Sequence, residues 1–522
     1  MNLHPGAVAA REPEREAIVI GAERWSYARL DHFSADAARV LHTHGIAGGD
    51  VVAILMGNRP EFLGLCWAMQ RGGLYYLPVP TRSTPAEIAY LLNDSGAKAL
   101  LVEPALAATA AAACEGLDCK LWSIGETEHA ATLPQATKDM AHPPAVEGGD
   151  MLYTSGTTGR PKGVRRPLTG EPLGSDARRV RRGEELFGFT GETRFLSPAP
   201  LYHAAPLRFA MNLLRTGACV VGMERFDAAD ALRLLEAERI THSQWVPTMF
   251  KRLLDLPLAE REAYNLSAHQ TAIHAGAPCP PAVKRAMLEW WGPILHEYYS
   301  GTESVGFTHI TAREWLERPG SVGRPYGCTV HILDKDGREM PPDKTGAVYF
   351  AGKGGFAYHG DPAKTQAAKA HDGLTTMGDV GFLDEDGFLF LTDRAHFTII
   401  SGGVNIYPSE VEAALLSLPQ VRDCAVFGLP DPDLGEAVAA VVEAETADSP
   451  LDADLARKLA AMLDPLLARP KHPRLWRFGS VGRNETGKIA KAALREHCAR
   501  PGQMLDLRQP QNTRTLEEER TP

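Results

Sequence analysis

Short apolar runs separated by helical stretches dominate the first part of this 522-residue chain, up to about residue 150. Residues 51–55 and 98–102 are two such runs. Runs of this kind are typical of buried strands, so their alternation with helices predicts layered α/β structure. The same texture continues from residue 151 to residue 391, where we expect strands at 219–221 and 271–273 and an amphipathic helix at 228–239.

Two changes of texture divide the rest of the chain. Around residues 334–342, turn-rich sequence leads into short alternating runs, which predicts an antiparallel, β-rich subdomain. A break at residues 393–397 precedes a compact segment with the pattern of a small α+β domain. We therefore expect a large N-terminal domain at 1–394, a small C-terminal domain at 397–498 and a disordered tail at 499–522.

Charge and composition exclude several classes of protein. The formal net charge of -10 argues against a nucleic-acid binder, which normally presents a basic face. The eight cysteines are scattered without a Cys-x-x-Cys pair, so we interpret them as reduced thiols of a cytoplasmic enzyme. No stretch has the apolar length of a signal peptide or a transmembrane helix, so we expect neither secretion nor a membrane span.

The most informative stretch runs from Tyr153 to Gly163. Its glycines permit close backbone approach, its Ser and Thr hydroxyls can donate to oxyanions, and Lys162 adds a positive charge. A flexible surface loop is the simpler alternative. The strand-like residues before the loop and its Pro-Lys-Gly ending favour a phosphate cradle, with a spacing that is not that of a Walker A loop.

At this loop the sequence resembles the adenylate-forming superfamily of acyl-CoA synthetases, nonribosomal adenylation domains and firefly luciferase. The string from Tyr153 to Gly163 is similar to that superfamily's signature, and the resemblance extends from residue 58 to residue 488. It implies an AMP-forming enzyme whose large domain binds ATP and an acid. It also implies a small domain that rotates between an adenylating and a thioester-forming pose.

Later motifs of the superfamily follow in order. Segment 298–303 resembles the second core motif, which implies an aromatic ring on adenine, Thr302 on the α-phosphate and Glu303 on Mg²⁺. Asp379 resembles the carboxylate that binds ribose, and Lys488 the lysine that enters the site during adenylation. The positions implied for nucleotide and CoA binding are Thr154, Ser155, Gly156, Thr157, Thr158, Gly159, Lys162, Gly276, Ala277, Pro278, Tyr298, Tyr299, Ser300, Gly301, Asp379, Arg394, Gly402 and Gly403.

Each of these motifs taken alone also fits a structural role. Segment 298–303 could be a strand end leading into a helix cap, and Arg394 and Lys488 could be solvated surface residues. Their order behind the loop favours the functional interpretation. Two positions depart from the superfamily pattern: Met377 replaces a threonine before Gly-Asp, and His396 replaces the Asp or Lys of the hinge. A hinge at His396 is still implied, because a hinge needs a tolerant backbone more than one particular side chain.

The implied reaction uses ATP, Mg²⁺ and coenzyme A. A carboxylate attacks the α-phosphorus and expels pyrophosphate, and a thiol then displaces AMP. The catalytic positions implied by the resemblance are Lys488, Thr302, Glu303, which also binds the metal, and His203, a pocket or gate residue. No enzyme nucleophile is required.

The acid is less constrained by the sequence. Segments that usually wall the acyl pocket imply Tyr202, His203, Trp245, His274 and Gly276, although His203 and Trp245 also fit as core aromatics. No carboxylate is placed to bind a substrate amine. Strings at 358–365 and 399–408 look most like bacterial fatty-acyl and bile-acid CoA ligases, so we expect a bulky hydrophobic acid: long-chain fatty, steroid or aryl.

Two other functions share these motifs. One is an adenylating enzyme that loads an acyl carrier protein in trans, and the other is a luciferase-like oxidoreductase. The chain has no fused carrier domain and ends without Ser-Lys-Leu, which weighs against both. The sequence leaves open the oligomeric state, a homodimer included, and any regulation by lysine acylation.

Overall fold

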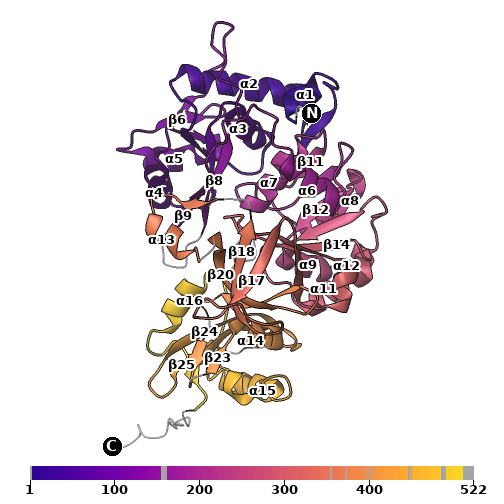
Figure 1. Ribbon diagram of the computed structural model, residues 1–522, viewed down its shortest axis with the longest axis vertical. Helices are drawn as coiled ribbons and strands as arrows, with labels where there is room; N and C mark the ends of the chain where they lie inside the picture. The colour runs from indigo at the N-terminus through magenta and orange to yellow at the C-terminus, as the bar shows by residue number, and fades with distance from the viewer. Residues whose placement is uncertain are drawn as a thin grey trace, which may run out of the picture.

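The computed structural model describes residues 3–154, 161–352, 355–370, 373–394, 397, 399–402, 404–444, 447, 449–483 and 489–508. Within these ranges the strands form three sheets, of 13, 8 and 6 strands. Figure 1 shows the two larger sheets with their helices in the upper part of the molecule and the C-terminal elements below them. The fold is therefore layered α/β with a small C-terminal α+β unit, as the sequence predicts.

The largest sheet has a parallel centre and an antiparallel extension. Strands β1, β11, β10, β12, β13 and β14 run parallel, and the strands beyond β14 are antiparallel. In spatial order the strands are β17 (Cys328–Leu333), β18 (Gly346–Gly352), β20 (Thr375–Leu383), β21 (Leu389–Arg394), β16 (Ser321–Pro325), β15 (Thr308–Thr311), β14 (Leu295–Tyr299), β13 (Thr271–His274), β12 (His242–Trp245), β10 (Arg194–Ser197), β11 (Cys219–Gly222), β1 (Glu16–Ile20) and β2 (Glu23–Ser26).

The second sheet is parallel except at one edge, where β8 turns back into β9 and β19 adds to β9. Its strands in spatial order are β19 (Ala357–Tyr358), β9 (Lys162–Arg165), β8 (Gly149–Thr154), β4 (Tyr75–Val79), β3 (Val51–Leu55), β5 (Ala99–Val102), β6 (Lys120–Ser123) and β7 (Ala131–Thr132). The apolar run at residues 51–55 thus forms a fully buried central strand, as expected.

Helices cover both sheets, and local sequence signals fix their ends. One example is α4, where Thr84 and Glu87 form a capping box and Gly96 ends the helix with φ +65°. The helix expected at 228–239 ends at Ala237, and Arg239 has a left-handed φ of 47°. The helices are α1 (Pro5–Ala9), α2 (Tyr27–Thr43), α3 (Pro60–Arg71), α4 (Pro85–Ser95), α5 (Ala107–Cys114), α6 (Arg178–Phe187), α7 (Ala204–Leu213), α8 (Ala228–Ala237), α9 (Pro247–Leu254), α10 (Leu258–Arg261), α11 (Pro281–Trp291), α12 (Ala312–Glu317) and α13 (Pro362–Ala367).

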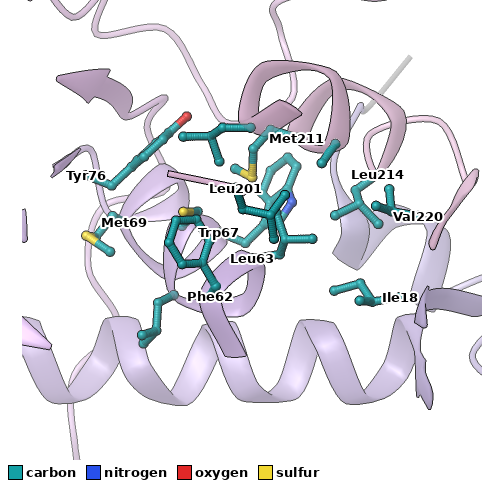
Figure 2. Packing of buried hydrophobic residues seen from close by; sticks show 14 of the residues in the cluster. Ile18, Phe62, Leu63, Trp67, Met69, Tyr76, Leu201, Met211, Leu214 and Val220 are labelled. Atoms are coloured by element: carbon teal, nitrogen blue, oxygen red, sulfur yellow. The ribbon is translucent and has the colours of Figure 1, made fainter. Parts of the chain in front are cut away.

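One hydrophobic cluster joins the two larger sheets. Figure 2 shows Leu63 and Trp67 of α3 lying close to Leu201 and to Met211 of α7. The same cluster includes Ile18 of β1 and Tyr76 of β4, so it contacts both sheets. Helices α3 and α7 therefore form the packed layer between the two sheets. Burial of each such side chain stabilises the fold by about 1.5–3 kcal/mol.

The C-terminal unit has its own sheet and its own core. Its strands are β23 (Val404–Ile406), β22 (Ile399–Ser401), β25 (Gly435–Ala444), β26 (Leu475–Phe478) and β27 (Leu505–Asp506), with β24 (Val421–Asp431) paired to β25, and its helices are α14 (Pro408–Leu416), α15 (Ala453–Leu463) and α16 (Lys491–Cys498). Val411 of α14 and Trp476 of β26 belong to a cluster made only of residues from this unit.

The predicted tail starts too early. Leu505 and Asp506 pair with β26, Leu505 packs on the domain core, and Arg508 forms an ion pair of 2.6 Å with Asp431. The prediction is therefore wrong for residues 499–508, because their apolar side chains find a partner surface that local polarity does not reveal; residues 509–522 lie outside the described residues. Within the described ranges, none of the helices is both long and apolar enough to cross a bilayer.

Candidate active site

The predicted phosphate cradle lies at the tip of the β8–β9 hairpin. Thr154 and Lys162 are paired at its two ends, and Ser155, Gly156, Thr157, Thr158 and Gly159 lie outside the described residues. Two tyrosine hydroxyls attach the hairpin to α4. The Tyr153 hydroxyl donates to Asp94 Oδ2 at 2.6 Å, and the Tyr90 hydroxyl of α4 donates to the Pro161 carbonyl at 2.9 Å. Both ends of the loop are therefore fixed by contacts to a helix of the second sheet.

Two ammonium groups lie beside this loop. Lys162 Nζ is 2.7 Å from Asp361 Oδ2, and Asp361 caps α13 by accepting from the Lys364 backbone N–H at 2.8 Å. The hydrogen bond from Lys162 holds the pKa of the Asp361 carboxyl below its usual value. Burial, and then the nearby Lys162 ammonium, lower the pKa of Lys364. An anionic ligand at this position would be favoured because it relieves the repulsion between the two cations.

Glu303 reaches the same place from the end of β14. The Tyr358 hydroxyl donates to Glu303 Oε1 at 2.8 Å, and the Lys364 ammonium lies 4.6 Å from the centre of the Tyr358 ring. Tyr358 belongs to β19, which pairs with β9 next to the loop. A Cβ at Gly301 would meet the Met377 sulfur and a Glu303 carboxylate oxygen, so a larger residue here would displace these two flexible side chains.

The donor set fits a magnesium ion held largely by phosphate. Among the described residues there is no cluster of three His, Cys, Asp or Glu side chains that could hold a metal ion by itself. Mg²⁺ typically takes one or two carboxylates together with substrate phosphates and water. Glu303, with its second carboxylate oxygen not engaged by Tyr358, supplies ligand chemistry of this kind beside a loop suited to phosphate.

An arginine that the sequence analysis did not identify positions the Thr302 turn. Arg208, on α7, binds Asp150 Oδ2 at 2.6 and 3.0 Å. It also donates to the Thr302 carbonyl at 3.1 Å and to Ser304 Oγ at 3.0 Å. Since Asp150 lies on β8 and Thr302 follows β14, Arg208 connects the two larger sheets at the site. A half-buried arginine in the middle of a helix carries no local sequence signal for this contact.

The predicted nucleoside residues come from strands β14, β20 and β21 of the largest sheet. The Tyr299 hydroxyl donates to Asp379 Oδ2, and Asp379 is buried. Asp379 on β20 is the register partner of Arg394 on β21, whose side chain lies outside the described residues. Gly276 has φ +89° and is the second residue after the end of β13. Of the neighbouring predicted positions, Ala277 is half-buried, Pro278 is exposed, and the Ser300 hydroxyl donates to the Gly306 carbonyl at 2.7 Å.

The predicted pocket residues divide between the two faces of the largest sheet. The rings of Tyr202 and His203 are 4.6 Å apart where α7 begins. Trp245 and His274 are fully buried on the opposite face, where Trp245 packs on Trp291 at 5.4 Å and burial lowers the pKa of His274 well below its usual value. The structure therefore does not bring Trp245 and His274 together with Tyr202 and His203.

The predicted hinge and C-terminal residues are only partly described. Gly402 has φ +57° in the turn between β22 and β23, and its N–H donates to the Leu434 carbonyl at 2.8 Å. Gly403, His396 and Lys488 lie outside the described residues. The Ser409 hydroxyl of α14 donates to the Thr392 carbonyl of β21, which links the C-terminal unit to the end of the large sheet.

The chain belongs to the AMP-binding enzyme family. The family model described as AMP-binding enzyme matches residues 7–357, and the model for the AMP-binding enzyme C-terminal domain matches residues 410–488. These matches confirm the resemblance to the adenylate-forming superfamily.

Individual relatives cover almost the whole chain. It is 32% identical over 485 residues to the long-chain-fatty-acid–CoA ligase FadD13 of Mycobacterium tuberculosis, covering 91% of this chain and 93% of the relative. It is 33% identical over 495 residues to a feruloyl-CoA synthase of Amycolatopsis, covering 93% and 96%. Among solved structures, the o-succinylbenzoate CoA synthetase MenE of Bacillus subtilis, in complex with its acyl-adenylate intermediate, superposes with a TM-score of 0.78 at 26% identity, covering 95% and 98%.

Proposed function

We propose that this chain is an ATP-dependent acid–CoA ligase, which forms an acyl-AMP and pyrophosphate and then an acyl-CoA and AMP. The observation that carries the proposal is the Tyr358–Glu303 hydrogen bond, which brings a carboxylate beside the Lys162 and Lys364 ammonium groups. A polyphosphate at this position meets two cations directly and one carboxylate through a divalent metal. Membership of the AMP-binding family and relatives named as CoA ligases support the same enzyme class.

Adenylation requires the protein to position two reactants and to neutralise charge, since a carboxylate attacks the α-phosphorus and pyrophosphate leaves. In the proposed mechanism, Lys162 and the loop at 155–159 hold the departing phosphates. Thr302, in the turn fastened by Arg208, donates its hydroxyl to the α-phosphate, and Lys488 adds positive charge at the attacking carboxylate. Mg²⁺ at Glu303 supplies Lewis-acid stabilisation of the phosphate oxygens.

In this proposal the nucleoside is held at the end of β14 and the middle of β20. The Tyr299 hydroxyl occupies one carboxylate oxygen of Asp379 and fixes the orientation of the group. In the proposed complex the other oxygen accepts from the ribose hydroxyls, a charge-assisted interaction. Arg394, opposite Asp379 in the ladder, is assigned to the ribose or the phosphate, and the 276–278 segment to adenine.

Thioester formation needs a different arrangement of the small domain. The thiol sulfur attacks the acyl carbonyl carbon and a carbon–sulfur bond forms. The bond from that carbon to the AMP phosphate oxygen breaks, its electrons leave on AMP, and the thiol proton is released to solvent. We assign rotation of the 397–498 domain against the 1–394 domain to a hinge at His396, which withdraws Lys488 and brings Gly402 and Gly403 to the pantetheine arm.

The proposed acid is bulky and hydrophobic. The face of the largest sheet that α7 covers is lined by aromatic side chains such as Phe209, Tyr298 and Phe307, which suit an acyl, aryl or steroid body.

The direct test is to incubate the pure chain with ATP, Mg²⁺ and a panel of fatty, aryl and steroid acids. CoA, or a phosphopantetheinylated carrier protein, is then added as acceptor, and AMP and thioesters are identified by mass spectrometry. The expected result is AMP release with at least one acid and transfer to CoA. Transfer only to the carrier protein would refute CoA as acceptor, and AMP formation with none of the acids would refute the ligase function.

A further inference from the structure

On the face of the largest sheet that α7 covers, two of the polar side chains are bonded to each other. Gln244, on β12, is 6% exposed and Tyr298, on β14, is 8% exposed. Between them, Ile273 of β13 is the register partner of Gln244 on the same face. The ring of Tyr298 stacks on Phe307 with centroids 5.1 Å apart and lies 5.8 Å from Phe209 of α7. The Tyr298 ring therefore packs among aromatic side chains.

Hydrogen bonding satisfies this pair only in part. The Gln244 amide nitrogen donates to the Tyr298 hydroxyl oxygen at 3.2 Å, and Gln244 Oε1 is buried with no hydrogen-bond partner among the described protein atoms. Burial raises the pKa of Tyr298 to about 12, so its hydroxyl keeps its proton at neutral pH. The pair then presents one acceptor, Gln244 Oε1, and one donor, the Tyr298 proton.

The result does not depend on how the amide is oriented. With its nitrogen and oxygen exchanged, Gln244 Oε1 accepts from the Tyr298 hydroxyl, and the pair presents an amide donor together with the lone pair of the tyrosine oxygen. In both orientations one donor and one acceptor remain. A hydroxyl group, which both donates and accepts, is the simplest ligand group that satisfies the pair, whereas a carboxylate accepts only and an ammonium donates only.

The pair lies near the carboxyl ends of the parallel strands of the largest sheet. β12, β13 and β14 run parallel, and ligands of such sheets bind outside the carboxyl ends of the strands. Tyr298 directly precedes Tyr299, which is bonded to Asp379 of the nucleotide site. Gln244 is the next-to-last residue of β12. The last residue, Trp245, faces the opposite side of the sheet. Strand alternation thus turns Gln244, and not Trp245, toward α7.

We propose that Gln244 and Tyr298 recognise a hydroxyl group of the acid, so that the preferred substrates are bulky hydrophobic acids that carry a hydroxyl away from the carboxylate. This inference rests on the proposed ligase function. A hydroxyl on the acid satisfies the buried amide, whereas an acid without the hydroxyl leaves it unpaired and is therefore adenylated less efficiently.

The test uses pairs of acids that differ by one hydroxyl: 12-hydroxydodecanoate and dodecanoate, 4-hydroxycinnamate and cinnamate, and lithocholate and cholanate. The kcat/KM of AMP formation is measured for both members of each pair. In at least one pair we expect the hydroxylated acid to be favoured by about tenfold or more. Gln244→Leu and Tyr298→Phe should each reduce that ratio to about threefold or less, whatever their absolute rates.

A matched control is Gln270→Leu, an exposed glutamine just before β13, which should keep the wild-type ratio. If Gln244→Leu is inactive with both acids of a pair, Tyr298→Phe, which removes a single oxygen atom, decides the question. Equal rates within every pair, or a preference that survives both substitutions, would overturn the hydroxyl site while leaving the ligase function intact. Failure of the wild-type chain with all six acids while other acids of the broader panel give AMP would also overturn it, and failure with every acid would refute the ligase function itself.

Discussion

Replacing Arg208 with methionine should affect both stability and adenylation, and the two effects can be separated. The guanidinium binds Asp150 Oδ2 at 2.6 Å and the Thr302 carbonyl at 3.1 Å. The two side chains of the ion pair are only 17% and 6% exposed. Methionine keeps most of the side-chain volume but removes every hydrogen bond to the carboxylate and the turn.

The expected magnitudes follow from these contacts. Removing one partner of a buried ion pair costs about 3–5 kcal/mol, because the remaining charge stays buried. Removing both charges together, in Arg208→Met with Asp150→Asn, should restore most of that stability. The Thr302 turn is still unfastened in the double variant, and a displacement of about 1 Å at a reacting group lowers the rate by about 100-fold.

Two measurements make the separation. Thermal unfolding reports stability, and AMP release with saturating acid reports adenylation. Arg208→Met should unfold at a lower temperature and adenylate slowly, and the double variant should recover its unfolding temperature but not its rate. Recovery of both properties in the double variant would mean that Arg208 only compensates Asp150, and would refute its role in positioning Thr302.

Three further predictions concern the nucleotide, the small domain and pH. Asp379→Asn should raise the KM for ATP by about 10- to 100-fold through weaker ribose binding, while Tyr299→Phe should raise it less; equal effects would contradict the assignment. Lys488→Ala should abolish acyl-AMP formation but leave thioester formation from supplied acyl-AMP largely intact, with the exposed Lys458→Ala as control; equal loss of both steps would refute its role. Burial lowers the pKa of His242 to about 4 from 6.5, so the unfolded chain binds a proton between these pH values and the folded chain does not. The free energy of unfolding, measured with urea, should therefore fall by about 3 kcal/mol as the pH drops from 6.5 to 4, and His242→Gln should remove this share of the slope.

Local sequence predicted the elements better than their arrangement. The buried strand at residues 51–55 and the helix beginning at Ala228 follow from apolar periodicity, and the structure has both. The order of strands in the largest sheet does not follow from periodicity, because β1 pairs with β11 about two hundred residues later in the chain. The ordered segment around Leu505 was missed for the same reason, since its partner β26 is distant in sequence.

Sequence motifs propose the residues of the candidate site but not the contacts between them. Motif order identified Glu303 and Asp379, yet it gave no sign that Tyr358 would hold Glu303 or that Arg208 would hold the Thr302 turn. Such bonds join side chains from different elements, and no local pattern specifies them. The segment containing Gln244 and Trp245 shows the same limit. Alternation requires the two side chains to face opposite sides of β12. Only the position of α7 decides which of the two sides faces the proposed ligand. Sequence reasoning chose the larger aromatic residue, and packing against Trp291 explains why an aromatic belongs in the core at that position.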